Sequence, residues 1–302
     1  MIGIPVNSSQ VPNTGLVGAL AQRGFSLDTG QFQTGRPDRS TVAMVDPHGL
    51  PVVAKLYPNG GGEATFANMQ EVWRSSFGEH RTPPGLPRPV DYLPDLGVLV
   101  MERLGGRPLV EFEAFDPEVV DEAVYLVADL HRSDAVPARR RNHRRIARSI
   151  WRKADDVTAR RPRYGPLFQR VASALEAAVV DVDELVPSHG DFSPRNVLVG
   201  PKRTVLIDWD RLQSADPARD LAYFGAWCWA WRVRRQDRSD WSILDRVVAL
   251  YGSLRPRARI EQRLRFHLAA GLMRIAYELV ALWPEDESFV PVLAEEALRS
   301  LT

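Results

Sequence analysis

The apolar pattern of the chain changes once, after Pro108. Before that point, short runs rich in Val and aromatic residues are separated by turns, which is typical of strands. They predict a hairpin at 41–57, two further strands at 90–93 and 98–101, and one helix at 63–77 between them. After it, apolar residues recur every three or four positions, which is typical of amphipathic helices. We place these helices at 117–132, 138–161, 166–182, 217–235, 241–252, 257–283 and 289–301.

This pattern predicts an α+β chain of two lobes. The first, residues 1–104, is a small antiparallel sheet with one helix, and the second, residues 105–302, is larger and mainly helical. Gly105 and Gly106 mark the link between the lobes. One short extended hairpin, 197–199 and 205–207, lies within the helical part of the chain.

Composition narrows the range of possible functions. The 302 residues carry a formal net charge of +1, so bulk charge gives no reason to expect nucleic acid or an anionic membrane as a partner. A single cysteine, Cys228, cannot form an internal disulfide, which favours a reducing compartment such as the cytoplasm. No apolar run approaches the roughly 20 residues that a membrane helix needs, and the first ten residues have no signal-peptide pattern.

Two neighbouring segments carry the residues best suited to chemistry, 189–196 (His-Gly-Asp-Phe-Ser-Pro-Arg-Asn) and 207–210 (Ile-Asp-Trp-Asp). Phosphoryl transfer needs hard oxygen ligands for a magnesium ion and a group that accepts the proton of the attacking hydroxyl. Asn196 and Asp208 can supply the metal ligands, and Asp191 can act as the base. His189 would hold the loop, and Ser193 would contact the transferred phosphoryl. The alternative is a polar turn before a hairpin, with Asp191 and Asn196 as turn residues.

The order His-Gly-Asp, four variable residues, Asn, and a later Asp between an aliphatic and an aromatic residue resembles the aminoglycoside phosphotransferase and choline kinase-like family. The resemblance implies a two-lobed protein-kinase-like fold. It also implies transfer of the γ-phosphate of ATP or GTP, with Mg²⁺, to a hydroxyl of a small molecule. A protein kinase is disfavoured because Gly190 stands where His-Arg-Asp would have arginine, and no Ala-Pro-Glu segment follows Asp208.

The resemblance also implies a nucleotide site in the first lobe. Lys55, one of only three lysines in the chain, matches the strand lysine that contacts the phosphates and pairs with a glutamate of the next helix. We prefer Glu71 as that glutamate, with Glu63 as the alternative. The Met101 carbonyl and the Arg103 amide would then contact the purine edge, and Val100 would line the pocket behind it.

Further matches concern support of the loop. Asp220, in Asp-Pro-x-x-Asp-Leu-Ala, matches the family's aspartate that anchors the catalytic loop, and His131 matches a histidine packed beneath it. The chain departs from kinases at residues 30–40, where no Gly-x-Gly-x-x-Gly sequence is present, so the phosphate-covering loop stays undefined.

The acceptor is left open between an aminoglycoside or another antibiotic, which would imply resistance, and a metabolite such as an amino sugar, choline or homoserine. Polycationic aminoglycosides call for acidic pockets. The second lobe has nearly balanced charge, but Glu278 and the acidic run 285–287 could bind a cation. Trp227, Trp229 and Trp231 could stack on an acceptor, although core packing is the simpler interpretation. A non-catalytic nucleotide-binding scaffold is the alternative from another class. The sequence leaves the oligomeric state open.

Overall fold

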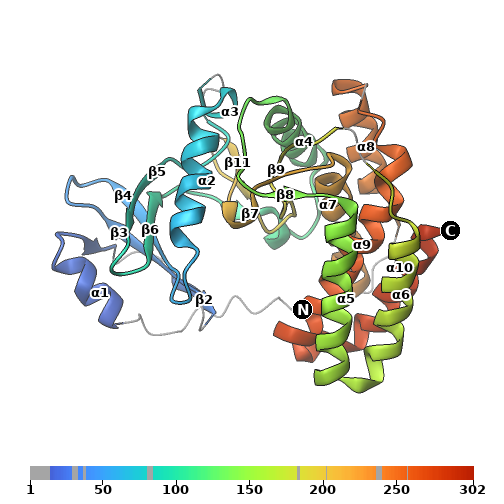
Figure 1. The fold of residues 1–302 in the computed structure, drawn as a ribbon. Coiled ribbons are helices and arrows are strands. Elements are labelled where there is room, and N and C mark those ends of the chain that lie inside the picture. The colour runs from blue at the N-terminus through green and yellow to red at the C-terminus, as the bar shows by residue number, and fades with distance from the viewer. Residues whose placement is uncertain are drawn as a thin grey trace. The chain divides into compact units, whose positions relative to one another are not determined.

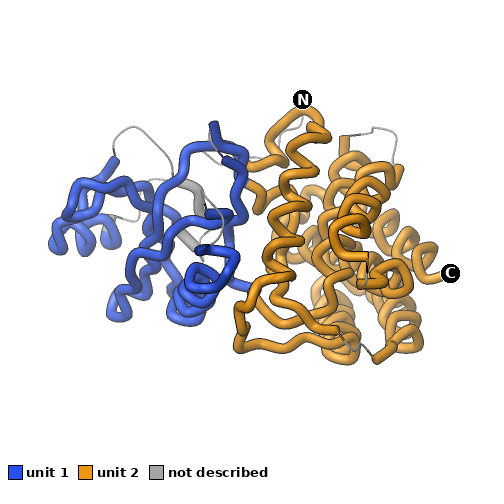
Figure 2. The backbone as a smooth tube through the Cα atoms, turned by 90° about the horizontal axis from the view of Figure 1, so that it is seen from above, with its two compact units in different colours: residues 1–107, 198–211 blue, residues 108–197, 212–302 orange. Residues whose placement is uncertain are grey.

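The computed structural model divides the chain into two compact units, coloured separately in Figure 2. The residues it describes are 14–28, 33–36, 39–79, 84–181, 184–201, 203–235, 240–256 and 258–302. Unit 1 comprises residues 1–107 and 198–211, and unit 2 comprises residues 108–197 and 212–302. The hairpin near residue 200, which the sequence placed within the second lobe, thus groups with the first part of the chain.

Unit 1 is built on a six-stranded antiparallel sheet with the order β1-β3-β4-β6-β5, in which β2 also pairs with β3 (Figure 1). The strands are β1 (Ser26–Leu27), β2 (Gln33–Arg36), β3 (Arg39–Val45), β4 (Pro51–Leu56), β5 (Pro89–Leu93) and β6 (Val98–Glu102). Three helices accompany them: α1 (Thr14–Ala21), α2 (Gly62–Arg74) and α3 (Ser76–Glu79). The hairpin, the two later strands and the intervening helix are therefore confirmed.

The position of Lys55 follows from the alternation of side chains along β4. Val52 and Ala54 are buried in an apolar cluster with Leu16 and Leu20 of α1. Because side chains alternate across a strand, Lys55 projects from the opposite face. It lies between Thr41 of β3 and Leu99 of β6 in the strand register.

A second sheet of three short strands has the order β11-β10-β7, where β7 is Arg107–Pro108, β10 is Val197–Val199 and β11 is Thr204–Leu206. Gly106, just before β7, has φ +145°. A Cβ at this position would lie 2.6 Å from the Val199 carbonyl oxygen, so the close approach of the two backbones requires glycine.

Unit 2 is mainly helical. Its longer helices are α4 (Pro117–Arg132), α5 (His143–Arg160), α6 (Gly165–Ala177), α7 (Ala218–Arg234), α8 (Ser242–Leu254), α9 (Glu261–Leu282) and α10 (Val290–Leu301). Its apolar core is formed mainly by α5, α6, α7, α9 and α10. Trp227, Trp229 and Trp231 of α7 are all buried, as the core-packing interpretation predicted. Among the described residues, no helix is long and apolar enough to cross a membrane.

A third small sheet, with the order β8-β12-β9, was not predicted from the sequence. Its strands are β8 (Arg140–Arg141), β9 (Val186–Ser188) and β12 (Gln213–Ala215). The helix predicted at 138–161 accordingly starts later, at His143, where the Asn142 side chain accepts the Arg145 amide and caps it. These short strands were missed because no local turn joins them, and their pairing depends on segments that are distant in sequence.

Candidate active site

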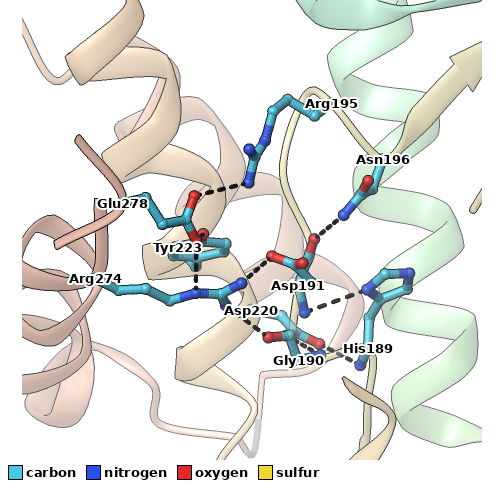
Figure 3. Close-up of polar contacts among 9 residues, drawn as sticks. All are labelled: His189, Gly190, Asp191, Arg195, Asn196, Asp220, Tyr223, Arg274 and Glu278. Atoms are coloured by element: carbon cyan, nitrogen blue, oxygen red, sulfur yellow. Dashed lines mark hydrogen bonds and ion pairs between the residues drawn. The ribbon is translucent and has the colours of Figure 1, made fainter. Parts of the chain in front are cut away.

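The loop 189–196 follows β9 and turns sharply at Gly190, whose φ is +74°. Asp220, in the first turn of α7, binds the backbone of the loop at Gly190. Its carboxylate accepts the backbone amides of His189 at 2.8 Å and Gly190 at 2.9 Å, and the Ser188 hydroxyl at 2.9 Å. The expected anchoring role of Asp220 is confirmed by these bonds (Figure 3).

Asp220 is fully buried, and His131 of α4 contacts its carboxylate. Burial by itself would raise the pKa of Asp220, but the hydrogen bond and charge of His131 lower it to about 2. His131 Nε2 lies 3.2 Å from the carboxylate, and His131 Nδ1 lies 2.8 Å from the Tyr251 hydroxyl. His131 is therefore the hydrogen-bonded core histidine that the sequence suggested.

Asp191 points toward α9, where Arg274 binds it. Arg274 Nη2 donates to Asp191 Oδ1 at 2.6 Å, and Arg274 Nη1 donates to the Gly190 carbonyl at 3.1 Å (Figure 3). Asp191 and Arg274 are 7% and 8% exposed, so water screens this ion pair little. One guanidinium thus fixes both the carboxylate and the backbone beside it.

The same guanidinium belongs to a larger buried network. Arg274 Nε donates to Glu278 one helical turn later, at 3.3 Å, and Arg195 of the loop donates to the other oxygen of Glu278 at 3.2 Å. The Arg274 guanidinium lies over the ring of Tyr223, and that of Arg195 lies 3.9 Å from the ring centre of Trp227. These cation–π contacts add to the hydrogen bonds that hold the loop.

Sequence reasoning missed Arg274. A signal was present: Arg274 and Glu278 are the charged residues of an otherwise apolar stretch, 266–280, apart from His267. Two opposite charges at i, i+4 inside a buried helix face imply a partner elsewhere. That partner, Asp191, could not be identified without the fold.

Asn196 closes the loop onto its own start. Its side-chain nitrogen donates to the Asp191 carbonyl at 2.8 Å, and its amide donates to the Ser193 carbonyl at 2.9 Å. With the nitrogen engaged, the amide oxygen is the atom of Asn196 suited to a hard cation. The buried Ser193 hydroxyl oxygen has no hydrogen-bond partner among the described residues.

In unit 1, Lys55 lies within a second charged cluster. Lys55 Nζ donates to Asp208 Oδ1 at 2.7 Å and to Asp210 Oδ1 at 3.1 Å. Burial by itself lowers the pKa of Lys55, but the charges of Asp208 and Asp210 raise it above its usual value. Lys55 is therefore a fixed cation.

Asp208 sits in a left-handed conformation, with φ +67°, just after β11. Its side chain is 31% exposed, whereas that of Asp210 is 11% exposed. Asp210 also accepts the hydroxyls of Tyr57 at 2.6 Å and Thr65 at 3.1 Å, which accounts for its burial. Of the two carboxylates, Asp208 is the more accessible to a metal ion, and the carboxylate and amide oxygens of Asp208 and Asn196 are the donor types that Mg²⁺ prefers.

The structure differs from the expected partner of Lys55. The ion pairs of Lys55 are with Asp208 and Asp210 rather than with Glu71 or Glu63 of α2. The residues of α2 that reach this cluster are Thr65 and Asn68, and Asn68 donates to the Trp209 carbonyl at 3.2 Å. Asp210 stands two residues after the motif residue Asp208 in the sequence. Its ion pair with Lys55 could not be predicted, because it depends on the fold that also brings Tyr57 and Thr65 to the same carboxylate.

The residues expected to contact a purine lie at the end of β6. Val100 is fully buried, and Met101 is partly exposed. The Arg103 amide donates to the Pro51 carbonyl at 3.2 Å, so contact with a purine would have to replace that bond. Residues 30–32 and 37–38 of the segment expected to cover the phosphates lie outside the described residues, and 33–36 and 39–45 pair as β2 and β3.

Comparison with known families identifies the chain. Residues 31–261 match the phosphotransferase enzyme family. The chain belongs to this family. Both motif segments, 189–196 and 207–210, lie within the matched residues, and the resemblance stated from the sequence is confirmed. Comparison with curated proteins finds no relative.

Solved structures share the fold at low sequence identity. A choline kinase from Cryptosporidium parvum Iowa II matches 95% of this chain and 94% of its own with a TM-score of 0.68 and 9% identity. Spectinomycin phosphotransferase APH(9)-Ia, in complex with ADP and spectinomycin, matches 97% and 93% with a TM-score of 0.62 and 16% identity. Macrolide 2'-phosphotransferase from Brachybacterium faecium matches 95% and 98% with a TM-score of 0.57 and 19% identity. These similarities confirm the predicted protein-kinase-like α+β fold.

Proposed function

We propose that this phosphotransferase transfers the γ-phosphate of ATP or GTP to a hydroxyl group of a small molecule. The observation that carries the proposal is the folding of the loop 189–196 by its own motif residues. Asn196 binds the Asp191 carbonyl, and Asp220 binds the amides of His189 and Gly190. A loop held this firmly can keep a base aimed at one position, which is the main requirement of phosphoryl transfer.

In unit 2, Asp191 is the proposed base that accepts the proton of the attacking hydroxyl. Arg274 fixes its orientation through the 2.6 Å ion pair. Ser193 is proposed to contact the transferred phosphoryl, because a buried hydroxyl without a protein partner is suited to a ligand oxygen. Asn196 is the proposed metal ligand of this unit, through its side-chain oxygen.

In unit 1, Lys55 is the proposed contact of the α- and β-phosphates, and Asp208 the proposed ligand of Mg²⁺. The ion, when bound, would neutralise charge on the phosphates. Val100 and Met101 remain the proposed purine contacts, and the Arg103 amide would join them by exchanging its bond to Pro51. We propose an ion pair between Lys55 and Glu71 only for a state in which Lys55 no longer binds Asp208 and Asp210. A nucleoside triphosphate donor favours a cytoplasmic reaction.

Three of the four acidic residues that could bind a polycationic acceptor are paired with arginines, and the fourth, Glu285, is exposed. Glu278 binds Arg195 and Arg274, Asp286 binds Arg234, and Glu287 binds Arg161. A carboxylate already neutralised by a guanidinium attracts an ammonium group weakly. We therefore propose an acceptor of low positive charge in preference to a polycationic aminoglycoside. If the acceptor is an antibiotic such as a macrolide, the enzyme inactivates antibiotics. If the acceptor is an amino sugar, choline or homoserine, the enzyme belongs to metabolism.

The test is transfer of labelled γ-phosphate from ATP and from GTP to pooled aminoglycosides, macrolides, amino sugars, choline and homoserine. Asp191→Asn serves as the blank, and Asp129→Asn, on an exposed part of α4, is the matched control. Label that enters one pool with the wild type and with Asp129→Asn, but not with Asp191→Asn, supports the proposal. Equal transfer by Asp191→Asn, or a wild type that binds no nucleotide, overturns it.

A further inference from the structure

Outside the proposed site, the fold brings together two histidines and an aspartate from separate parts of unit 2. β8 and β12 run parallel, with Arg140 opposite Ser214 and Arg141 opposite Ala215. Because the two strands end side by side, the residues that follow them, His143 and Asp216, are neighbours. His267 of α9 completes the group.

The three side chains converge on one another through single atoms. His143 Nε2 lies 3.1 Å from Asp216 Oδ2 and 3.0 Å from His267 Nε2, and His267 Nε2 lies 3.1 Å from the same Asp216 oxygen. All three residues are at least 98% buried. Among the described residues, this is the one group of at least three such side chains with ligand atoms close enough to hold a metal ion.

The spacing of these three atoms is compatible with one metal ion. Three atoms about 3.05 Å apart lie on a circle of radius about 1.8 Å, which is shorter than the 2.0–2.1 Å of a zinc–nitrogen bond. An ion about 1 Å above their plane would therefore bond to all three, with angles between bonds of about 96°. Two imidazoles and one carboxylate on one face of an ion are a recurring ligand set for divalent transition metals.

Charge and protonation also suit a cation. Burial would raise the pKa of Asp216, but hydrogen bonds from His143 and His267 hold it well below its usual value, so the carboxylate is ionised. Burial lowers the pKa of His267 to about 4, so its imidazole is neutral near pH 7. Metal binding through Nε2 puts the proton of each imidazole on Nδ1, and because the buried Nδ1 atoms of His143 and His267 have no partner among the described residues, this feature lowers the expected affinity.

Arg263, one turn before His267 on α9, lowers the affinity of the cluster for a cation. Its Nε donates to Asp216 Oδ2 at 2.7 Å, the same oxygen that faces both imidazoles. The guanidinium charge opposes a second cation nearby, but a carboxylate oxygen has lone pairs for both a donor and a metal. A cavity of about 230 Å³ has His143, Arg144, Val180 and Asp181 among its lining residues, so it adjoins the cluster at His143.

We propose that His143, Asp216 and His267 form a binding site for a divalent transition metal ion of the zinc type. The ion ties the start of α5 and the segment before α7 to the middle of α9. Both imidazoles then carry their protons on Nδ1, and water completes the coordination. The site uses none of the residues proposed for phosphoryl transfer, so it stands whether or not the proposed function holds.

The experiment uses the full chain, stripped of metal with a chelator, returned to chelator-free buffer and titrated with Zn²⁺ against a chromophoric chelator. Excess Mg²⁺ is present to fill sites built from oxygen ligands. We expect one tight equivalent, and X-ray absorption at the zinc edge should show two imidazole ligands. His143→Gln and His267→Gln should each weaken binding at least ~100-fold, since each removes one of three ligands. His48→Gln, at an exposed histidine, should leave affinity unchanged.

Arg263→Gln provides a test in the opposite direction. Loss of the competing guanidinium should tighten zinc binding by about tenfold, which corresponds to one repulsive charge interaction of about 1.4 kcal/mol. The absorption spectrum of the wild type decides the case even if a histidine variant does not fold. A wild type that retains no zinc, a spectrum without two imidazoles, or full zinc binding by folded His267→Gln would each overturn the proposal.

Discussion

Arg274 Nη2 lies 2.6 Å from Asp191 Oδ1 in a buried ion pair between α9 and the loop 189–196. The pair joins Asp191, the proposed base, to a helix in which the sequence analysis found no phosphotransferase motif. Because a buried carboxylate needs a fixed partner, the position of Asp191 depends on α9 as much as on its own loop.

Arg274→Ala should destabilise the fold by about 3–5 kcal/mol, because it removes the buried ion-pair partner of Asp191 and leaves Glu278 with only one of its two arginines, Arg195. Urea unfolding measures this change. Arg265→Ala is the matched control, since Arg265 lies on the same helix but is exposed, and it should change the unfolding free energy by less than about 0.5 kcal/mol. A similar effect for the two variants would contradict the proposed role of the ion pair.

Asp208→Asn should raise the Mg²⁺ concentration needed for half-maximal phosphoryl transfer at least ~10-fold, since a carboxylate is the proposed ligand. Asp210→Asn should change this concentration much less, because Asp210 is occupied by Lys55, Tyr57 and Thr65. Magnesium titration of activity checks both variants. Equal shifts of this Mg²⁺ concentration in the two variants would contradict the assignment of Asp208, rather than Asp210, as the metal ligand.

Gly190→Ala should lower stability by about 1–2 kcal/mol, because a Cβ is strained at φ +74°. The same change should reduce the rate of phosphoryl transfer, because the Gly190 amide binds Asp220 and its carbonyl binds Arg274. Gly252→Ala is the control, since its helical position in α8 has open space for a Cβ. Wild-type stability and rate in Gly190→Ala would show that the turn tolerates a side chain.

His267 should make stability depend on pH between about 6.5 and 4. Burial lowers the pKa of His267 to about 4 in the folded protein, against 6.5 for an exposed histidine. The unfolded chain therefore binds a proton first as pH falls, so the unfolding free energy is highest above pH 6.5 and declines down to about pH 4. The decline should be on the order of 3 kcal/mol.

Urea unfolding at several pH values, with chelator present, measures this decline. It should be largely lost in His267→Gln and kept in His48→Gln, because His48 is exposed. An unchanged slope in folded His267→Gln would assign the pH dependence to another group.

Local apolar patterns and turn residues in the sequence were sufficient to predict many of the helices and strands. Strands β3 to β6, the helix α2 and the hairpin predicted at 197–199 and 205–207 follow from apolar patterns and turns, whereas β1 and β2 were not predicted. The motif residues Asp191, Asn196, Asp208 and Asp220 could be named because their spacing is fixed along the chain. Strands β8, β9 and β12 could not be predicted, since no turn joins them and they pair segments that are distant in sequence, whereas the similarly short β10 and β11 are joined by one turn.

The sequence by itself determined which groups are present in the chain and where local structure begins and ends, because propensity and motif spacing act over a few residues. Only the tertiary structure decided which charges neutralise one another. Arg274 meets Asp191 across 83 positions, and Lys55 meets Asp208 across 153. His267 likewise meets His143 across 124. Such pairings follow from packing of the whole chain, because the cost of burying a charge is met by whichever opposite charge the fold brings near.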